Sequence, residues 1–364
     1  MRSPVPAPRA HRSMPADSGR DAVEAYLEQA VHGDGRAGAR LALDLIDNGV
    51  PSADVIVNLL AAAQREVGER WLANRWTVAE EHLASGVSQK ALDAVAHAIG
   101  APTSTGLIAV ACAEGDWHSL PAQMFAEMLR AEGFAVAFLG ASTPADHVAS
   151  FLSRRRPDAL AVSCNLAPFF GGVTRLADTA HRYRIPVLAG GRALGREPGR
   201  AVRLGADAWA PGIDDAVAVL RGWQQQPPPV RAEPTSFTTA AVRLDVTAAE
   251  IAAEALESLC AGYPPMASLD DAGLARTRKD LAHITRFAAA ARLVDDQTVL
   301  TEMLDWLQAF HANRGVRAVA LSVGLNAGLT ALAPVIRRTD PGAARLVLGA
   351  VRDEPAVTPR GESG

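Results

Sequence analysis

The chain has few cysteines, few aromatic residues and little net charge. Its 3 cysteines among 364 residues are too widely spaced for a disulfide framework of the kind found in small secreted proteins. A net charge of -4 provides no general attraction to nucleic acid or to an anionic membrane. We expect Arg, Asp or Glu to interrupt every apolar stretch that could span a bilayer, and residues 1–20 lack the apolar segment of a secretory signal. These absences favour a cytoplasmic protein with no membrane partner.

Helical patterns dominate the first part of the chain. Residues 1–20 and 354–364 lack apolar periodicity, so we expect both to be disordered tails. Over residues 21–100, apolar residues recur at helical spacing in four successive stripes. This pattern predicts a four-helix bundle.

From residue 104 the pattern changes to short apolar runs, each followed by a loop and a helical stretch. Runs without strict alternation are typical of strands buried on both faces of a parallel sheet. We therefore predict a flavodoxin-like, doubly wound α/β domain over residues 104–224. Its strands are expected at residues 107–112, 135–139, 159–163 and 186–189, with a shorter one at 206–210.

Prolines and glutamines mark the end of this domain. Residues 225–244 include three consecutive prolines and read as a semi-rigid linker. Residues 245–353 return to helical spacing without strand-length runs, so the last domain is predicted to be all-α. The whole chain is thus expected to combine α/β and all-α domains.

Three polar or glycine motifs follow strands of the predicted sheet. They are Asp116-Trp-His118 after the first strand, Ser163-Cys-Asn-Leu166 at the end of the third, and Gly190-Gly191 after the fourth. Carboxyl ends of parallel strands share one edge, where open α/β sheets bind ligands. A histidine near a carboxylate suits a metal ligand, because the carboxylate can hold the second ring nitrogen. From the residues alone, an alternative interpretation remains: a flavodoxin-like domain whose loop histidine is solvated.

These spaced motifs resemble the cobalamin-binding domain. The resemblance implies that His118 replaces the cofactor's own dimethylbenzimidazole as the lower cobalt ligand, with Asp116 as its partner. It also implies a slot for the displaced nucleotide tail, lined by Ser163, Leu166, Gly190 and Gly191. The chain departs from the family at Pro121, where glycine is usual, although proline is tolerated at a helix start.

The bundle offers polar and aromatic residues at one end. Thr77 and Glu80 form a predicted capping box, which places Glu81 and His82 in the first turn of the fourth helix, near Trp71 at the end of the third. An indole wall and a polar pair suit a nucleoside. The alternative is a core tryptophan beside a solvated Glu-His pair.

The Trp71-x9-Glu81-His82 spacing is similar to the helical cap of cobalamin-dependent photoreceptors. There the motif surrounds the upper 5'-deoxyadenosyl group of adenosylcobalamin. Light-sensing repressors of this group have a histidine directly after the tryptophan, where this chain has Leu72, so a bis-histidine lit state is not expected. They also carry an N-terminal DNA-binding helix-turn-helix, for which residues 1–20 are too short, so we expect no direct DNA binding.

The last domain contains polar residues on otherwise apolar helices. Arg276, Asp280 and His283 follow the spacing of one helix face, and Arg314 lies beyond them. An acid, a histidine and arginines suit a linear tetrapyrrole, whose pyrrole nitrogens need an acceptor and whose propionates need cations. The alternative is a dimerisation domain with a solvated charged face.

The order of bundle, sheet domain, Pro-rich linker and helical domain resembles the photocobilins. That resemblance implies a globin-like C-terminal domain that holds a bilin such as biliverdin. Asp280 and His283 are then candidates for the pyrrole contacts, and Arg276 and Arg314 for the propionates. The predicted function is a light sensor, not an enzyme, that signals to a protein partner and could form homo-oligomers. The alternatives are a corrinoid carrier of a methyltransferase system and a non-catalytic dimerising cobalamin-binding module.

Overall fold

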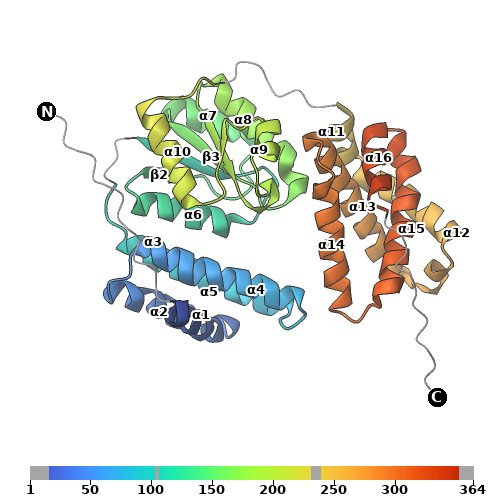
Figure 1. The fold of residues 1–364 in the computed structure, drawn as a ribbon, viewed down its shortest axis with the longest axis horizontal. Coiled ribbons are helices and arrows are strands. Elements are labelled where there is room, and N and C mark those ends of the chain that lie inside the picture. The colour runs from blue at the N-terminus through green and yellow to red at the C-terminus, as the bar shows by residue number, and fades with distance from the viewer. Residues whose placement is uncertain (1–15, 103–105, 231–238, 352–364) are drawn as a thin grey trace.

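The computed structural model describes residues 16–102, 106–230 and 239–351. Three parts are visible in Figure 1, where a helical cap lies beneath a sheet domain and a second helical domain lies beside both. The predicted tails lie mostly outside the described residues, as does the middle of the predicted linker. One difference is clear at the N-terminus: α1 begins at Ala16, inside the segment expected to be a tail.

The cap is the predicted helical bundle. Its third helix is continuous but contains a π-helical segment between two α-helical ones. The core includes Tyr26, whose hydroxyl donates to Ser88 Oγ at 3.2 Å. The cap elements are α1 (Ala16–Val31), α2 (Gly35–Asp47), α3 (Ser52–Val55), η1 (Ile56–Ala61), α4 (Ala62–Leu72) and α5 (Val78–Ala98).

The sheet domain has the predicted doubly wound architecture. Its strands are parallel in the order β2-β1-β3-β4-β5, which is the flavodoxin-like order. Each expected apolar run contains a strand: β1 (Leu107–Cys112), β2 (Ala135–Phe138), β3 (Ala159–Ser163), β4 (Val187–Gly190) and β5 (Ala208–Trp209). Side chains of α6 (Ser119–Ala131) and α10 (Ile213–Gln225) cover one face. The other face packs against α7 (Ala145–Arg155), α8 (Phe170–Arg182) and α9 (Gly199–Arg203).

The C-terminal domain is all-α, as expected. It starts with α11 (Thr239–Val246), inside the range predicted as linker. A 3-10 segment, η4 (Pro264–Ser268), follows α12 (Ala248–Gly262). The remaining helices are α13 (Asp271–Val294), α14 (Thr298–Ala312), α15 (Ala318–Arg337) and α16 (Pro341–Gly349). The globin-like character of this domain stays a prediction.

Helix α15 corrects the expectation about apolar stretches. Among the described residues it is the one helix long and apolar enough to cross a membrane, with no Asp, Glu, Lys or Arg before Arg337. The C-terminal half of α15 packs in the domain core through Leu329, Leu332 and Ile336. The N-terminal half is more open, and Val319 is 49% exposed. A core helix of a globular domain meets the same criteria of length and composition.

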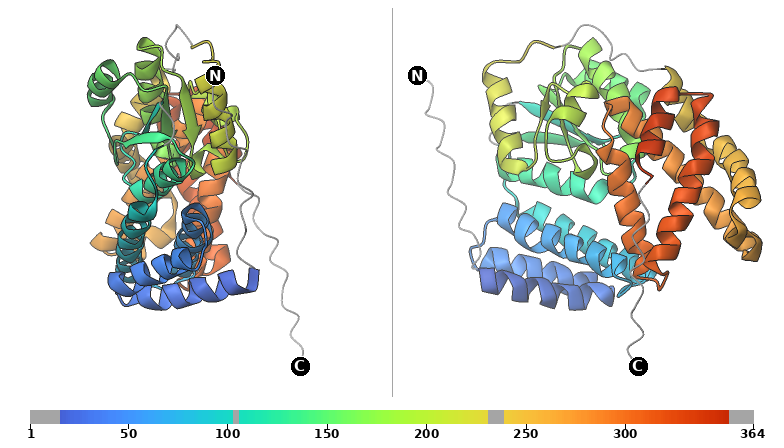
Figure 2. Two further views of the ribbon diagram at one scale, coloured as in Figure 1. Left: turned by 90° about the vertical axis from the view of Figure 1, so that its left-hand side faces the viewer. Right: turned by 45° about the vertical axis from the view of Figure 1, so that its right-hand side comes forward.

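The C-terminal domain shares a core with the sheet domain. Helix α13 packs against α8, α9 and the 3-10 turn η2 (Ala167–Phe169), so one apolar cluster runs through both parts. On the other face of the sheet, α6 contacts the cap, where its Met124 enters the cap core. Two views in Figure 2 agree that α14 extends from the level of the sheet domain to the level of the cap.

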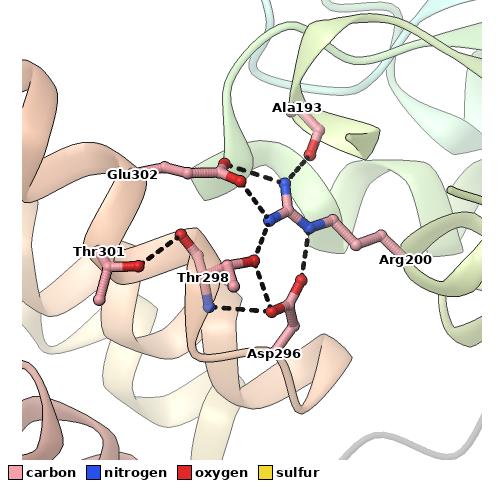
Figure 3. A network of polar contacts seen from close by, with 6 residues as sticks. All are labelled: Ala193, Arg200, Asp296, Thr298, Thr301 and Glu302. Carbon is pink, nitrogen blue, oxygen red and sulfur yellow. Dashed lines mark hydrogen bonds and ion pairs between the residues drawn. The ribbon is translucent and has the colours of Figure 1, made fainter. Parts of the chain in front are cut away.

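A buried arginine crosses the boundary between sheet and C-terminal domains. Arg200 on α9 is 8% exposed, and its guanidinium donates five hydrogen bonds. One goes to the carbonyl of Ala193; the others reach Asp296, Thr298 and Glu302 at the start of α14 (Figure 3). Every guanidinium N–H therefore has an acceptor, which makes the burial of this charge tolerable.

The capping box of α5 provides a first prediction. Thr77 Oγ1 accepts from the Glu80 amide at 3.2 Å, and Glu80 accepts from the Thr77 amide. Replacing Thr77 by Ala should make the amides of residues 78–81 exchange about three- to tenfold faster with solvent, because a cap is lost. Thr247→Ala is a matched control, since Thr247 precedes α12 without a side-chain cap bond. Equal acceleration at both helix starts would contradict this account.

Candidate functional site

The loop after β1 is organised around a buried carboxylate. Asp116 is fully buried, and its two oxygens accept from both backbone and side-chain donors. Oδ1 accepts from the His118 amide at 3.0 Å, and Oδ2 accepts from the Asn165 amide at 2.7 Å. Asn165 also directs its side-chain amide toward Oδ2, at 3.4 Å, and donates to the carbonyl of His118 at 3.2 Å. Asp116 thus ties the loop after β3 to the loop after β1.

The same carboxylate holds the His118 ring. His118 Nδ1 lies 2.8 Å from Asp116 Oδ1, while the side chain is 57% exposed. The hydrogen bond to Asp116 raises the pKa of His118, although partial burial acts in the opposite direction. Burial alone would raise the pKa of Asp116, but the bonds from His118 and Asn165 outweigh it and lower that pKa. With Nδ1 engaged, Nε2 is the nitrogen available to a metal.

The other two motifs lie along the same edge of the sheet. Ser163 pairs with Cys112 on one side and with Gly190 on the other, so the ends of three adjacent strands are in register. Gly191 has φ +104°, and a Cβ there would lie 2.4 Å from the carbonyl oxygen of Cys164. Only glycine fits this turn. Leu166 is 41% exposed beside it.

Proline at position 121 is compatible with the fold. Helix α6 begins at Ser119, so Pro121 lies in the first turn, where backbone N–H groups have no intrahelical acceptor. The departure from the family motif therefore leaves the helix that follows His118 intact.

The cap brings Glu81 toward this edge. The carboxylate of Glu81 is close enough to His118 to raise the pKa of that histidine. His82 Nδ1 lies 2.5 Å from Glu81 Oε2, and Ser85 donates to Glu81 Oε1 at 3.0 Å. The carboxylate is half-buried whereas the His82 side chain is 73% exposed. The predicted Glu-His pair is thus formed at the start of α5, on the same side as His118.

Trp71 has partners that the sequence analysis did not anticipate. Its ring lies 6.0 Å from the Trp306 ring and 5.5 Å from the Phe310 ring, both on α14. The Arg314 guanidinium lies 3.5 Å above Phe310 and 5.7 Å from the Trp71 ring. Trp71 is therefore a member of an aromatic cluster shared by the cap and the C-terminal domain.

The four candidate bilin residues are only partly together. Arg276 and His283 are exposed on α13, and Asp280 between them is half-buried. Burial raises the pKa of Asp280 despite the nearby charges of His311, His283 and Arg276. Arg314 is engaged with the cap: it donates to the carbonyls of Trp71 and Leu72 at the end of α4, at 3.3 and 3.4 Å.

The C-terminal domain also has an open cavity of about 550 Å³. It lies between α12 and α15, and none of the four candidate residues lines it. Its lining includes an ion pair of Arg338 and Glu254, together with Tyr263. The volume is within the usual range of small-molecule sites.

Sequence reasoning missed several residues of this region. Asn165 belongs to the Ser163-to-Leu166 motif, and its position was the only signal available for a contact with Asp116. Trp306 and Phe310 are four residues apart on α14, as expected for one helix face, but nothing local indicates Trp71 as their partner.

Comparison with known families identifies the ligand of this chain. Two family models match the chain, each described as a B12 binding domain, one over residues 106–219 and the other over residues 22–96. This is a cobalamin-binding protein. Neither match extends into the C-terminal domain, where bilin binding stays a prediction.

The curated relative is a regulator. HTH-type transcriptional repressor CarH of Myxococcus xanthus is 31% identical to this cobalamin-binding protein over 156 residues, which are 42% of this chain and 51% of the relative. The chain thus spans about half the length of the curated relative it matches.

Two solved structures are similar to a little over half of the chain. The monomethylamine corrinoid protein of Methanosarcina barkeri is 19% identical, with a TM-score of 0.49, over 56% of this chain and 99% of that one. A cobalamin-binding protein from Desulfitobacterium hafniense DCB-2 is 22% identical, with a TM-score of 0.30, over 55% of this chain and 98% of that one.

The residues present fit a corrinoid. The cobalt of a corrinoid would take a protein nitrogen ligand, and a half-exposed imidazole fixed by a buried carboxylate suits that role. His118 would hold the cobalt through Nε2, and Asp116 would keep the proton on Nδ1.

The His118–Asp116 pair gives a pH prediction for the cofactor-free protein. The pKa of His118 is raised, so the pair's contribution to stability is complete below the unfolded value of about 6.5 and is lost as pH rises through the higher folded value. On the acid side, the pKa of Asp116 is lowered, so its contribution to stability is present above pH about 3.9 and is lost as pH falls through the lower folded value.

An NMR titration of the cofactor-free protein should place the midpoint of the His118 titration above about 6.5, and Asp116→Asn should lower that midpoint. A midpoint unaffected by Asp116→Asn would contradict the pairing.

Proposed function

We propose that this cobalamin-binding protein is a light sensor that uses adenosylcobalamin bound without its own lower base. The observation that carries the proposal is the arrangement of Asp116 and His118 at a strand end, with Glu81 of the cap close enough to raise the pKa of His118. The sheet domain thus offers a nitrogen ligand for cobalt, and the cap offers polar groups for an upper ligand. The similarity to CarH, a transcriptional repressor, supports a signalling role.

Residues of the sheet domain would hold the lower side of the cofactor. His118 supplies the ligand nitrogen, and Asp116 orients the ring and retains the Nδ1 proton. Ser163 and Leu166 would contact the displaced nucleotide tail, and the turn at Gly190 and Gly191 would let the tail approach the backbone. When bound, adenosylcobalamin supplies a cobalt–carbon bond that visible light can break.

Residues of the cap would hold the upper adenosyl group. Trp71 offers an aromatic wall, and Glu81 and His82 can hydrogen-bond ribose or adenine. Loss of the group would remove contacts that favour one cap position over another, and the cap would shift. The cap movement would pass its signal to a protein partner in the cytoplasm or to a change in oligomeric state.

The C-terminal domain would add a second chromophore. The half-buried carboxylate of Asp280, beside His283 and His311, can accept hydrogen bonds from pyrrole nitrogens. Arg276 can pair with a propionate. The guanidinium of Arg314 already donates to carbonyls of the cap, so the propionate role is best supported for Arg276. A bilin such as biliverdin fits this chemistry.

The cobalamin proposal predicts a spectral and a photochemical change. The dark protein with adenosylcobalamin should show a base-off spectrum with histidine ligation, and green light should convert it. His118→Ala should remove the histidine-ligated spectrum. His147→Ala, at an exposed residue of α7, should leave the spectrum unchanged. A spectrum that is stable in green light would reject light sensing. Stable binding of methylcobalamin, together with that result, would favour a corrinoid carrier of a methyltransferase.

The bilin proposal is tested separately with biliverdin. Addition to the full chain should give a red-absorbing band. Asp280→Asn should weaken biliverdin binding about tenfold or more, because a half-buried carboxylate acceptor is lost. Asp271→Asn, on the exposed start of the same helix, is the matched control. If biliverdin binds Asp280→Asn with full affinity, the site is elsewhere, and the cavity between α12 and α15 is the next candidate.

A further inference from the structure

Helix α14 contacts the sheet domain at one end and the cap at the other. At its start, Thr298 and Glu302 accept hydrogen bonds from buried Arg200 (Figure 3). At its end, Trp306 and Phe310 pack against Trp71. The cap and the sheet domain contribute the two sides of the proposed cobalamin site, so one helix connects both sides.

The contact with the cap is specific in geometry. The three rings have centroid separations of 5.3 to 6.0 Å, within the range of attractive aromatic pairs. Arg314 covers Phe310 and donates to two carbonyls at the end of α4, where a cation is also favoured by the helix dipole. Asn313 donates to the carbonyl of Leu72 at 3.0 Å. Residues of α14 and the turn after it therefore contact both the ring and the backbone carbonyl of Trp71.

We propose that α14 sets the position of the Trp71 indole for the upper ligand of cobalamin, with Trp306, Phe310 and Arg314 as positioning residues. The inference rests on the proposed function, in which Trp71 is the aromatic wall for the adenosyl group. The C-terminal domain thereby controls how strongly the cap prefers a large adenosyl ligand over a small one. By thermodynamic reciprocity, the adenosyl ligand stabilises the contact between Trp71 and α14.

A link from the helical domain to this contact is present in the structure. The His311 ring meets the Phe310 ring edge-on, with 5.4 Å between the ring centroids. His311 is also close enough to Asp280 to favour the charged form of that carboxyl. A change at Asp280 can thus reach Trp71 through two neighbouring residues of α14. This chain of contacts is short and contiguous, as physical coupling between two sites requires when it travels through packed side chains.

The experiment uses full-length variants and compares dark affinities for adenosylcobalamin and methylcobalamin. Phe310→Leu keeps an apolar side chain but removes the central ring, and Arg314→Gln removes the cation. Either change should lower the preference for adenosylcobalamin about fivefold or more, with methylcobalamin affinity retained. Glu302→Gln is the control on the same helix, because it weakens the Arg200 contact and leaves the aromatic cluster in place.

A second readout needs no cofactor. In the cofactor-free protein, Phe310→Leu should speed amide exchange at residues 70–73 and change the tryptophan near-ultraviolet circular dichroism, whereas Glu302→Gln should do neither at that segment. Unchanged exchange and an unchanged preference in Phe310→Leu would overturn the inference. An equal loss of affinity for both cobalamins would also overturn it, because that result indicates a merely structural role.

Trp71→Ala distinguishes the role of α14 from the role of Trp71 itself. If Trp71→Ala lowers the preference for adenosylcobalamin but Phe310→Leu does not, only the role of α14 fails. If Trp71→Ala leaves the preference unchanged, the proposed role of Trp71 in holding the upper ligand fails as well.

Discussion

The buried carboxylate of Asp116 is the interaction on which the functional part of this structure depends. A charge removed from water is costly unless donors surround it, and here the donors come from two different strand ends. Because His118 and Asn165 satisfy the same carboxylate, the loops after β1 and β3 have a fixed relation to each other. The imidazole is consequently oriented before any ligand arrives, which is the preorganisation that a metal ligand needs.

The C-terminal domain changes how the cap should be understood. In a two-part protein the cap would be held over the sheet domain mainly by the cap's own contacts with α6. Here α14 adds a second contact, so a cap movement must alter the packing of Trp71 against Trp306 and Phe310. A ligand that favours one cap position therefore acts on the C-terminal domain too. This arrangement gives the additional domain a physical route to influence the cobalamin site.

Local features were predictable from the sequence, and contacts between distant segments were not. Strands β1 and β3 could be located because their residues are apolar on both faces, and Asp116 and His118 are only two positions apart. The capping box at Thr77 is likewise a local pattern. The contact of Arg314 with Leu72 joins residues 242 positions apart, and the Arg200–Glu302 pair joins residues 102 positions apart. No periodicity encodes which helix end meets which, so neither the contact of Arg314 with the cap nor the Arg200 pair was predicted.

The most direct test of the central claim is whether a protein histidine, rather than the cofactor's own base, occupies the lower axial position. Electron paramagnetic resonance of the protein with chemically reduced, paramagnetic cobalamin reports the nucleus of the axial nitrogen. With histidine labelled by the heavy nitrogen isotope, the account predicts that the superhyperfine pattern changes from triplets to doublets, and that His118→Ala abolishes this change. Triplets that persist in the labelled protein would show that the cofactor's base remains bound and would contradict the role of His118.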